Sequence, residues 1–238
     1  MSAPADVGPA NPWGDDDLAA RMRGLDGGSG RPRPAVGTIP LGVPGVSVSP
    51  GDHICAFYRG ADQRDEVLVP FLREALLAGD KCICVLDDPC TDRVTIPLGA
   101  DLDLVQSLSS GQFELLSSEN TYLEGGSFSL DEMFAFWDKG IGGAVTADGF
   151  GFVRAVGEMT WALRDCPGVE DLLTYEAKLN RFLPRYPQVI LCMYDLERFS
   201  DGTLLLDLLR THPFVLLGGQ LLENPWYTGP DEFLSGRA

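Results

Sequence analysis

Residues 51–88 constrain the fold most, because they read as a strand, a turn, a helix and a second strand in immediate succession. Residues 53–58 (HICAFY) and 81–86 (KCICVL) are short, continuous apolar runs typical of buried strands. Between them, residues 67–78 carry apolar side chains at helical spacing, which predicts an amphipathic helix. The segment therefore has the layout of a nucleotide-binding α/β unit.

The turn after the first strand lacks the residues that hold a triphosphate. We expect residues 59–65 to form a polar loop, which contains a single glycine, Gly60, and no lysine or Gly-Lys-Ser/Thr sequence. A P-loop needs the lysine as a point charge and the glycine-rich backbone as an amide cradle. The sequence therefore predicts a degenerate P-loop, in a scaffold that binds something other than a nucleotide or binds nothing.

Apolar runs and helical patterns alternate along the rest of the chain. A capping box at Ser129 and Glu132 predicts a helix that fades at glycines 140, 142 and 143. Further helices are expected at residues 169–183 and 203–210, and further strands at residues 113–116, 150–159, 189–194 and 214–217. This alternation favours an α/β fold, with a mostly parallel sheet and helices on both faces.

Composition divides the chain into a tail and one domain. Residues 1–50 are rich in Pro, Gly and Ser and have few large apolar side chains at regular spacing, so we expect a disordered tail. Residues 51–238 are expected to form a single domain.

Charge and hydropathy exclude several classes of partner. The net charge of −17 disfavours direct binding to nucleic acid or to an anionic membrane. No apolar run approaches the ~20 residues of a membrane span, and the N-terminus has no secretion signal. We therefore expect a cytoplasmic protein with reduced cysteines.

A histidine and two cysteines form the first group of candidate site residues. If the strands at residues 53–58 and 189–194 are neighbours, side-chain alternation brings His53, Cys55 and Cys192 together. Packing of the cysteines as ordinary core residues is the simpler interpretation, so we predict no metal. The alternative is a zinc site whose fourth ligand is Asp195 or His212.

A second group combines polar residues on an otherwise apolar helix face with a strand arginine. Glu176 and Asn180 lie one turn apart within the apolar stripe of the helix at residues 169–183. A buried carboxylate needs a partner, and we expect Arg154 to provide it. The pair is either an internal salt bridge or a polar contact to a ligand.

A third group lies where the predicted strands end. Arg154 and Glu158 are four residues apart, which places both on one side of their strand. Open α/β sheets bind ligands at the carboxyl ends of their strands. We therefore expect a small-molecule pocket near Tyr58, Arg154, Glu158 and Asp195.

The sequence offers no intact catalytic motif. Its two histidines, His53 and His212, would have to supply any Ser-His-Asp or Cys-His mechanism, and no nucleophile elbow is present. The chain is therefore predicted to be a non-enzyme without a cofactor.

Seven segments spread over residues 50–234 together resemble the MEDS domain, the methanogen and methylotroph sensory domain of the DcmR type. They are GDHICAFY, FLREALLAGDKCICVLDD, RAVGEMTWALRD, YEAKLNRF, CMYD, RTHPFVLLGG and ENPWY. The resemblance implies a RecA-like or KaiC-like fold with a degenerate P-loop. It also implies a sensory role in signal transduction and transcription regulation, with a small, hydrocarbon-derived ligand.

The resemblance also implies which residues line the ligand site. They are His53, Cys55, Arg154, Glu158, Glu176, Cys192, Tyr194, Asp195 and His212. Related proteins combine the domain with a helix-turn-helix or a histidine-kinase-like module, neither of which we recognise in this sequence. Two alternatives stay open: a protein-interaction module of an anti-sigma-type pathway, with a regulatory protein as partner, and a residual nucleotide- or metal-binding enzyme.

Overall fold

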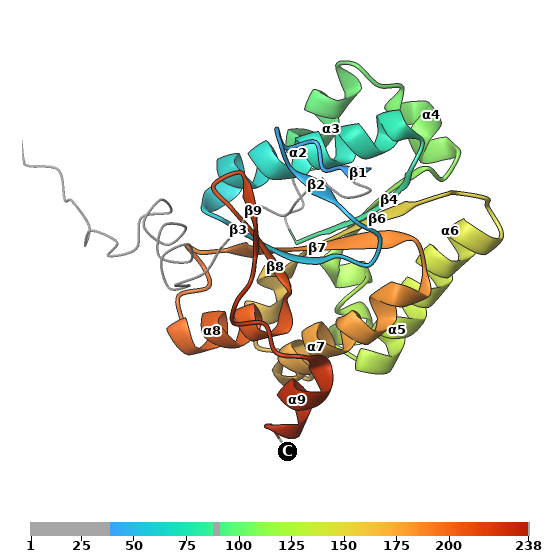
Figure 1. Ribbon diagram of the computed structural model, residues 1–238. Coiled ribbons are helices and arrows are strands. Elements are labelled where there is room, and N and C mark those ends of the chain that lie inside the picture. The colour runs from blue at the N-terminus through green and yellow to red at the C-terminus, as the bar shows by residue number, and fades with distance from the viewer. Residues whose placement is uncertain (1–38, 88–90, 238) are drawn as a thin grey trace, which may run out of the picture.

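A seven-stranded sheet forms the middle layer of the computed structural model, which describes residues 39–87 and 91–237 (Figure 1). Its strands are β3 (His53–Tyr58), β4 (Lys81–Leu86), β5 (Phe113–Ser117), β6 (Val153–Glu158), β7 (Gln188–Asp195), β8 (Phe214–Leu217) and β9 (Gln220–Glu223). They lie in the order β5-β4-β6-β7-β3-β8-β9, and every neighbouring pair is parallel except β8 with β9. The expected α/β fold with a mostly parallel sheet is confirmed.

Helices cover both faces of this sheet (Figure 1). One face carries α2 (Gly60–Ala78), α3 (Asp92–Gly99) and α4 (Leu104–Ser109). The other face carries α5 (Leu130–Trp137), α6 (Gly143–Thr146), α7 (Leu172–Phe182) and α8 (Gly202–Thr211), with α9 (Pro230–Ser235) packed against α7 and α8. Right-handed crossovers explain the division, because connections that run toward β5 and connections that run toward β9 must pass over opposite faces.

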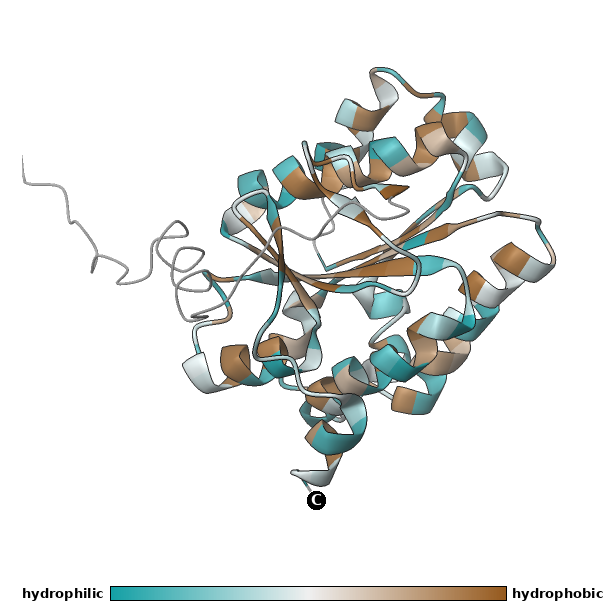
Figure 2. Cartoon of the chain, viewed as in Figure 1, coloured by the Kyte–Doolittle hydropathy of each residue, from teal (hydrophilic) through white to brown (hydrophobic). Residues whose placement is uncertain are grey.

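The inner strands are buried on both faces, which explains their continuous apolar sequences. Every residue of β3, β4, β6 and β7 is buried, and the brown strands of Figure 2 lie between helices whose outer sides are teal. Cys82 and Cys84 belong to the core on the α2 face, whereas Cys55 and Cys192 belong to the core on the α7 face. Side chains of the two faces therefore meet different helices.

The folded part begins before the boundary expected from composition. Strands β1 (Ile39–Pro40) and β2 (Ser47–Val48) form a small antiparallel hairpin. Leu41 and Val48 of this hairpin are fully buried in the core on the α2 face. The expected boundary at residue 51 is therefore too late, because these apolar side chains contribute to the core; residues 1–38 of the expected tail lie outside the described residues.

The expected polar loop at residues 59–65 is mostly helix. Helix α2 begins at Gly60, so Arg59 is the only residue between β3 and α2. The Gly60 N–H donates to Asp195 Oδ1 at 3.2 Å, and the Arg59 N–H donates to Gln63 Oε1 at 2.9 Å. Acceptors supplied by β7 and by the first helical turn thus allow the helix to start immediately.

The glycines after α5 do not end the helix, as the sequence suggested. The chain continues through a π-helical turn at Asp138–Gly142 into α6. A Cβ at Gly140 would lie 3.1 Å from Ile83 Cδ1, and one at Gly142 would lie 2.7 Å from the Tyr186 hydroxyl. These glycines therefore let the helix pack closely against its neighbours. Between β4 and β5, the chain forms the two short helices α3 and α4.

Replacing Gly157 of β6 by alanine is expected to lower the free energy of unfolding by about 1–3 kcal/mol, because the core there is overpacked by one methyl group. The added Cβ would lie 2.3 Å from the Tyr122 hydroxyl oxygen. Tyr122 is buried and stacks on Trp161 at 4.6 Å between ring centroids, so it has little room to move. Urea denaturation would measure the change. Gly143→Ala is the matched control, since its Cβ meets nothing within 4 Å; an equal loss in both variants would contradict the argument.

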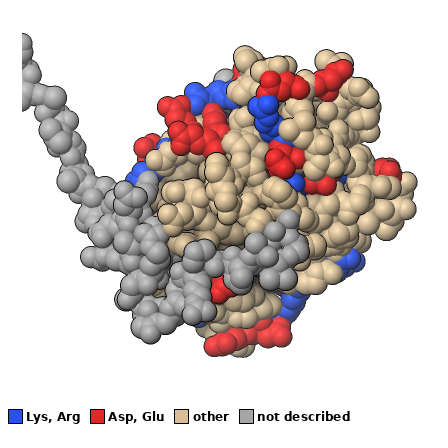
Figure 3. Space-filling view, turned by 45° about the horizontal axis from the view of Figure 1, so that its top comes forward, with Lys and Arg blue, Asp and Glu red and all other residues tan. Residues whose placement is uncertain are grey.

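Charges on the face with α2, α3 and α4 are distributed in small groups (Figure 3). Acidic side chains lie beside basic ones, as in the ion pairs of Arg73 with Asp101 and of Arg93 with Asp62 and Asp65. Part of the large negative charge is therefore balanced locally. Among the described residues, no helix combines the length and apolar composition that crossing a bilayer requires.

Candidate functional site

The carboxyl ends of β3, β6 and β7 bring three polar side chains to one edge of the sheet. Tyr58, Glu158 and Asp195 are the last residues of these strands, and Tyr58 is paired in register with Asp195. Asp87 directly follows β4 at the same edge. Parallel strands make this convergence unavoidable, and it is the edge at which open α/β sheets bind ligands.

A cavity of about 290 Å³ lies at this edge, and we refer to it as the edge cavity. It is lined by Tyr58, Ala61, Arg64, Asp87, Glu158, Asp195 and Arg198. The sequence predicted three of these residues. It missed Arg64, Asp87 and Arg198, although the position of Asp87 directly after a buried strand was a usable signal.

Glu158 holds the centre of the edge cavity. Its Oε1 accepts a hydrogen bond from the Tyr58 hydroxyl at 2.9 Å and faces Arg64 Nη1 at 3.4 Å, while its Oε2 accepts from the Asp87 N–H at 2.9 Å. Burial and the Glu158 carboxylate both raise the pKa of Tyr58 well above its ordinary value, so the phenol stays a donor. The position of Glu158 is thus fixed from three sides.

Asp87 and Asp195 are also held by protein donors. Asp87 accepts from Ser118 Oγ at 2.5 Å, Thr160 Oγ1 at 3.0 Å and Arg164 Nη2 at 2.7 Å. Asp195 accepts from the Gly60 N–H and, at 3.0 Å, from the Glu197 N–H. Protein hydrogen bonds therefore orient the carboxylates of the edge cavity without a ligand.

A buried polar cluster lies on the other face of the sheet, between β3, β7, α7 and the residue that follows α8. Its members are His53, Glu176, Cys192 and His212, whose ligand atoms all lie within 4.8 Å of one another. Glu176 Oε2 is 3.2 Å from His53 Nε2, 3.3 Å from His212 Nε2 and 3.6 Å from Cys192 Sγ. We refer to these four residues as the His-Glu-Cys cluster.

Asn180 and Tyr194 support this cluster. The Asn180 Oδ1 lies 3.2 Å from His53 Nδ1, and the Tyr194 hydroxyl donates to Glu176 Oε1 at 2.5 Å. Burial lowers the pKa of His53 to about 4, and the neighbouring His212 acts in the same direction. Burial alone would raise the pKa of Glu176, but the imidazoles of His212 and His53 hold it below its ordinary value. The cluster therefore combines an ionised carboxylate with a neutral His53.

The sequence interpretation of Glu176 needs correction. Its partners are His53, His212 and Tyr194, whereas the expected partner Arg154 lies on the α2 face. Arg154 donates to Asp80 Oδ2 at 2.9 Å and to the Pro40 carbonyl oxygen at 2.8 Å, and packs over the Phe71 ring at 5.5 Å. The sheet therefore separates the two residues.

Arg154 is also far from the edge cavity that it was expected to line. Arg154 and Glu158 share a side of β6, as predicted, but Arg154 lies near the amino end of that strand and Glu158 at its carboxyl end. Four residues of strand span about 13 Å. The structure therefore assigns Arg154 to the packing of the β1–β2 hairpin and α2.

The two residues considered as a fourth metal ligand lie in different sites. Asp195 belongs to the edge cavity, and His212 belongs to the His-Glu-Cys cluster. Cys55 is paired in register with Cys192 and is fully buried, but it lies outside the four-residue group. Burial, followed by the charge of Glu176, raises the pKa of Cys55, so this thiol stays protonated.

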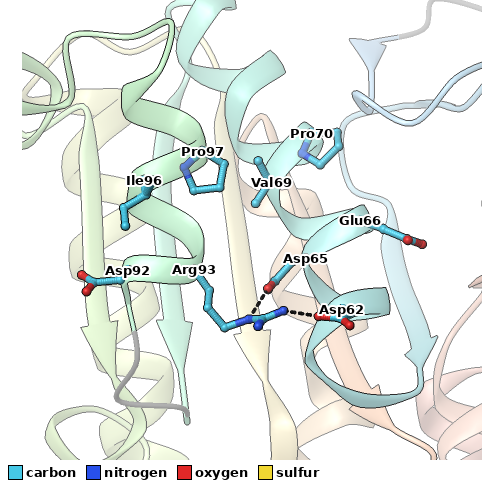
Figure 4. A pocket seen from close by; sticks show the side chains of 9 residues that line it. All are labelled: Asp62, Asp65, Glu66, Val69, Pro70, Asp92, Arg93, Ile96 and Pro97. Atoms are coloured by element: carbon cyan, nitrogen blue, oxygen red, sulfur yellow. Dashed lines mark hydrogen bonds and ion pairs between the residues drawn. The ribbon is translucent and has the colours of Figure 1, made fainter.

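A larger groove of about 670 Å³ lies between α2 and α3 (Figure 4). Val69, Pro70, Ile96 and Pro97 contribute apolar surface to it, and Arg93 forms ion pairs across it with Asp62 and Asp65. The groove thus offers mainly apolar contact, in contrast to the convergent polar groups of the edge cavity.

Comparisons with known proteins place the chain in a family. The family model described as "MEthanogen/methylotroph, DcmR Sensory domain" (MEDS) matches residues 52–213. The transcriptional repressor DcmR of Methylorubrum extorquens is 30% identical over 187 residues, which are 78% of this chain and 67% of that protein.

Two solved structures share the fold at low sequence identity. A KaiC-like protein of Pyrococcus horikoshii superposes with a TM-score of 0.54 at 14% identity, covering 76% of this chain and 80% of that one. The flagellar accessory protein FlaH of Methanocaldococcus jannaschii superposes with a TM-score of 0.52 at 13% identity, covering 82% of this chain and 89% of that one. The fold is therefore RecA-like.

Proposed function

The chain belongs to the MEDS family of sensory domains, and from this premise we propose that it senses a small organic molecule that binds in the edge cavity. A regulatory or sensory role follows from the family; the ligand and its place are our proposal. The observation that carries it is the set of polar side chains fixed around the 290 Å³ cavity at the carboxyl edge.

The size and chemistry of the edge cavity define the class of ligand. Its volume of about 290 Å³ lies at the lower limit of pockets for drug-sized ligands, about 300–1,000 Å³, so the cavity has room for a small organic molecule. Arg64 and Arg198 bring N–H groups to the cavity wall, the three carboxylates offer acceptors, and the Tyr58 oxygen, whose hydrogen is donated to Glu158, can accept. We infer a hydrocarbon derivative that carries oxygen, such as a short alcohol, aldehyde or carboxylic acid.

Ligand-observed NMR with one- to four-carbon alcohols, aldehydes and carboxylates would test the proposal on the full chain. We expect at least one compound to bind, and Glu158→Gln to weaken it at least about tenfold, because this variant removes the charge that orients Tyr58 and Arg64. Glu132→Gln, at an exposed position of α5, is the matched control. Absence of binding across the set, or equal binding by both variants, would contradict the proposal.

Magnesium-ATP is expected not to bind at millimolar concentration. The one-residue connection at Arg59 leaves no loop to surround a triphosphate. The Gly60 N–H at the start of α2, where a phosphate would bind, already donates to the Asp195 carboxylate. This arrangement supports a degenerate P-loop and a non-enzymatic regulator. Calorimetric titration would check it; micromolar affinity with measurable turnover would support the enzyme alternative instead.

The output of sensing is proposed to pass to a regulatory protein partner. The net charge of −17 disfavours contact with a phosphate backbone, so this part of the proposal assigns no nucleic-acid contact to the chain itself.

A further inference from the structure

The His-Glu-Cys cluster presents more acceptor atoms than the surrounding donors explain. Its four side chains are at most 1% exposed, so water does not satisfy them. Glu176 comes from α7, His53 from β3, Cys192 from β7, and His212 follows α8. Polar atoms from four segments that are distant in sequence thus lie close together in the core.

Hydrogen bonds fix the orientation of His53. The Asn180 amide nitrogen donates to the Thr211 carbonyl oxygen at 2.8 Å, so the Asn180 Oδ1 must face His53. The His53 Nδ1–H therefore donates to Asn180, and the His53 Nε2 carries a lone pair. That lone pair points at Glu176 Oε2 and at Cys192 Sγ, 3.2 and 3.4 Å away.

His212 is oriented in the same way. Its Nδ1 lies 2.8 Å from the Leu208 carbonyl oxygen, which accepts the ring N–H. In the neutral ring, this arrangement leaves the lone pair on Nε2, and no residue in the described part of the chain gives that nitrogen a hydrogen bond. This nitrogen faces the same Glu176 Oε2 at 3.3 Å.

With both rings neutral, two imidazole lone pairs and a carboxylate oxygen converge, and the Cys192 thiol proton is the one hydrogen available between them. One proton cannot satisfy three acceptors, and burial makes unpaired acceptors costly. A cation between the four side chains would satisfy all of them.

We propose that His53, Glu176, Cys192 and His212 bind one divalent transition-metal ion of the zinc class. A tetrahedron with metal–nitrogen and metal–oxygen distances of about 2.0–2.1 Å and a metal–sulfur distance of about 2.3 Å has edges of about 3.3–3.6 Å. Four edges of this cluster measure 3.2, 3.3, 3.4 and 3.6 Å. On binding, the Cys192 thiol releases its proton to solvent and coordinates as the thiolate.

The residues around the four ligands match those of a metal site. Each histidine donates its second ring N–H to a protein oxygen, which sets the tautomer that exposes Nε2. The Tyr194 hydroxyl holds the second carboxylate oxygen of Glu176. Four protein ligands leave no open position, so the site joins β3, α7, β7 and the start of β8 and is structural. It lies on the α7 face and is independent of the proposed ligand in the edge cavity.

Elemental analysis of the full chain, purified without chelating resin, is expected to find about one zinc per chain. Removal by a strong chelator should lower the melting temperature, and added Zn²⁺ should restore it. Replacement by Co²⁺ should give the visible absorption of a tetrahedral site and a thiolate-to-cobalt charge-transfer band. A chain that binds neither Zn²⁺ nor Co²⁺, with an unchanged melting temperature, would overturn the proposal.

Two cysteine variants locate the metal. Cys192→Ser should abolish the charge-transfer band and weaken metal binding by more than about 100-fold, whereas Cys84→Ser should retain both. Cys84 is the matched control, because it is equally buried in a neighbouring part of the sheet but faces α2. Asn180→Ala should weaken binding by about 10–100-fold while keeping the band, since it removes only a partner of His53. An unchanged band in Cys192→Ser would place the metal elsewhere and overturn the assignment.

Discussion

Arg154→Ala is expected to lower the free energy of unfolding by about 3–5 kcal/mol, because it breaks a buried ion pair. The Arg154 side chain is fully buried and forms an ion pair with Asp80. It also donates to the Pro40 carbonyl oxygen and covers the Phe71 ring. The truncation leaves the Asp80 carboxylate and the Pro40 carbonyl without this donor and opens a cavity beside α2. Urea denaturation monitored by circular dichroism would measure the loss.

Arg73→Ala is the matched control for this prediction. Arg73 forms an ion pair with Asp101, but both side chains are almost half exposed, so the loss should not exceed about 1 kcal/mol. Equal effects of the two variants would show that the Arg154 ion pair is not a structural element of the core.

Glu176→Ala is expected to have a comparable effect, also about 3–5 kcal/mol, because it leaves the buried Tyr194 hydroxyl without its acceptor and opens a cavity in a fully buried polar cluster. It removes the carboxylate that accepts from Tyr194 and separates the Nε2 atoms of His53 and His212. The two imidazole rings, 4.0 Å apart between centroids, would then face each other across a polar cavity. Denaturation with Glu170→Ala, at an exposed position just before α7, as control would measure it; a loss below 1 kcal/mol would contradict this role of Glu176.

The double variant distinguishes the observed arrangement from the salt bridge that the sequence suggested. Arg154 and Glu176 lie on opposite faces of the sheet and share no partner, so their effects should add within about 0.5 kcal/mol. A direct pair would give a coupling energy of up to about 3 kcal/mol. A coupling of that size would contradict the partner assignment of both residues.

The two polar sites have different physical designs. In the edge cavity, the carboxylates are satisfied by protein donors and line an opening at the end of the strands, which suits a reversible ligand. In the His-Glu-Cys cluster, the acceptors exceed the donors and solvent is excluded, which suits a permanently bound cation. The proposed ligand site thus lies at the edge of the sheet, whereas the proposed metal site lies in the core.

The sequence by itself determined the inner strands and several of the polar residues of the two sites. Continuous apolar runs marked the inner strands, because a strand covered on both faces needs apolar side chains on both sides. Polar residues within apolar patterns marked His53, Glu176 and Glu158, because burial of such groups requires a specific partner. Alternation also placed His53 and Cys192 on the same side of the sheet once β3 and β7 were assumed to be neighbours.

Only the tertiary structure decided the partners. The face of the sheet over which each helix passes depends on the spatial order of the strands, and a local pattern contains no information about that order. Because β6 connects to β7 in the direction of β9, α7 packs on the face opposite α2, and this brings Glu176 to the histidines and separates it from Arg154. Periodicity determines which side chains are buried together along one element, whereas the choice between neighbours on either side of a sheet is made by the topology.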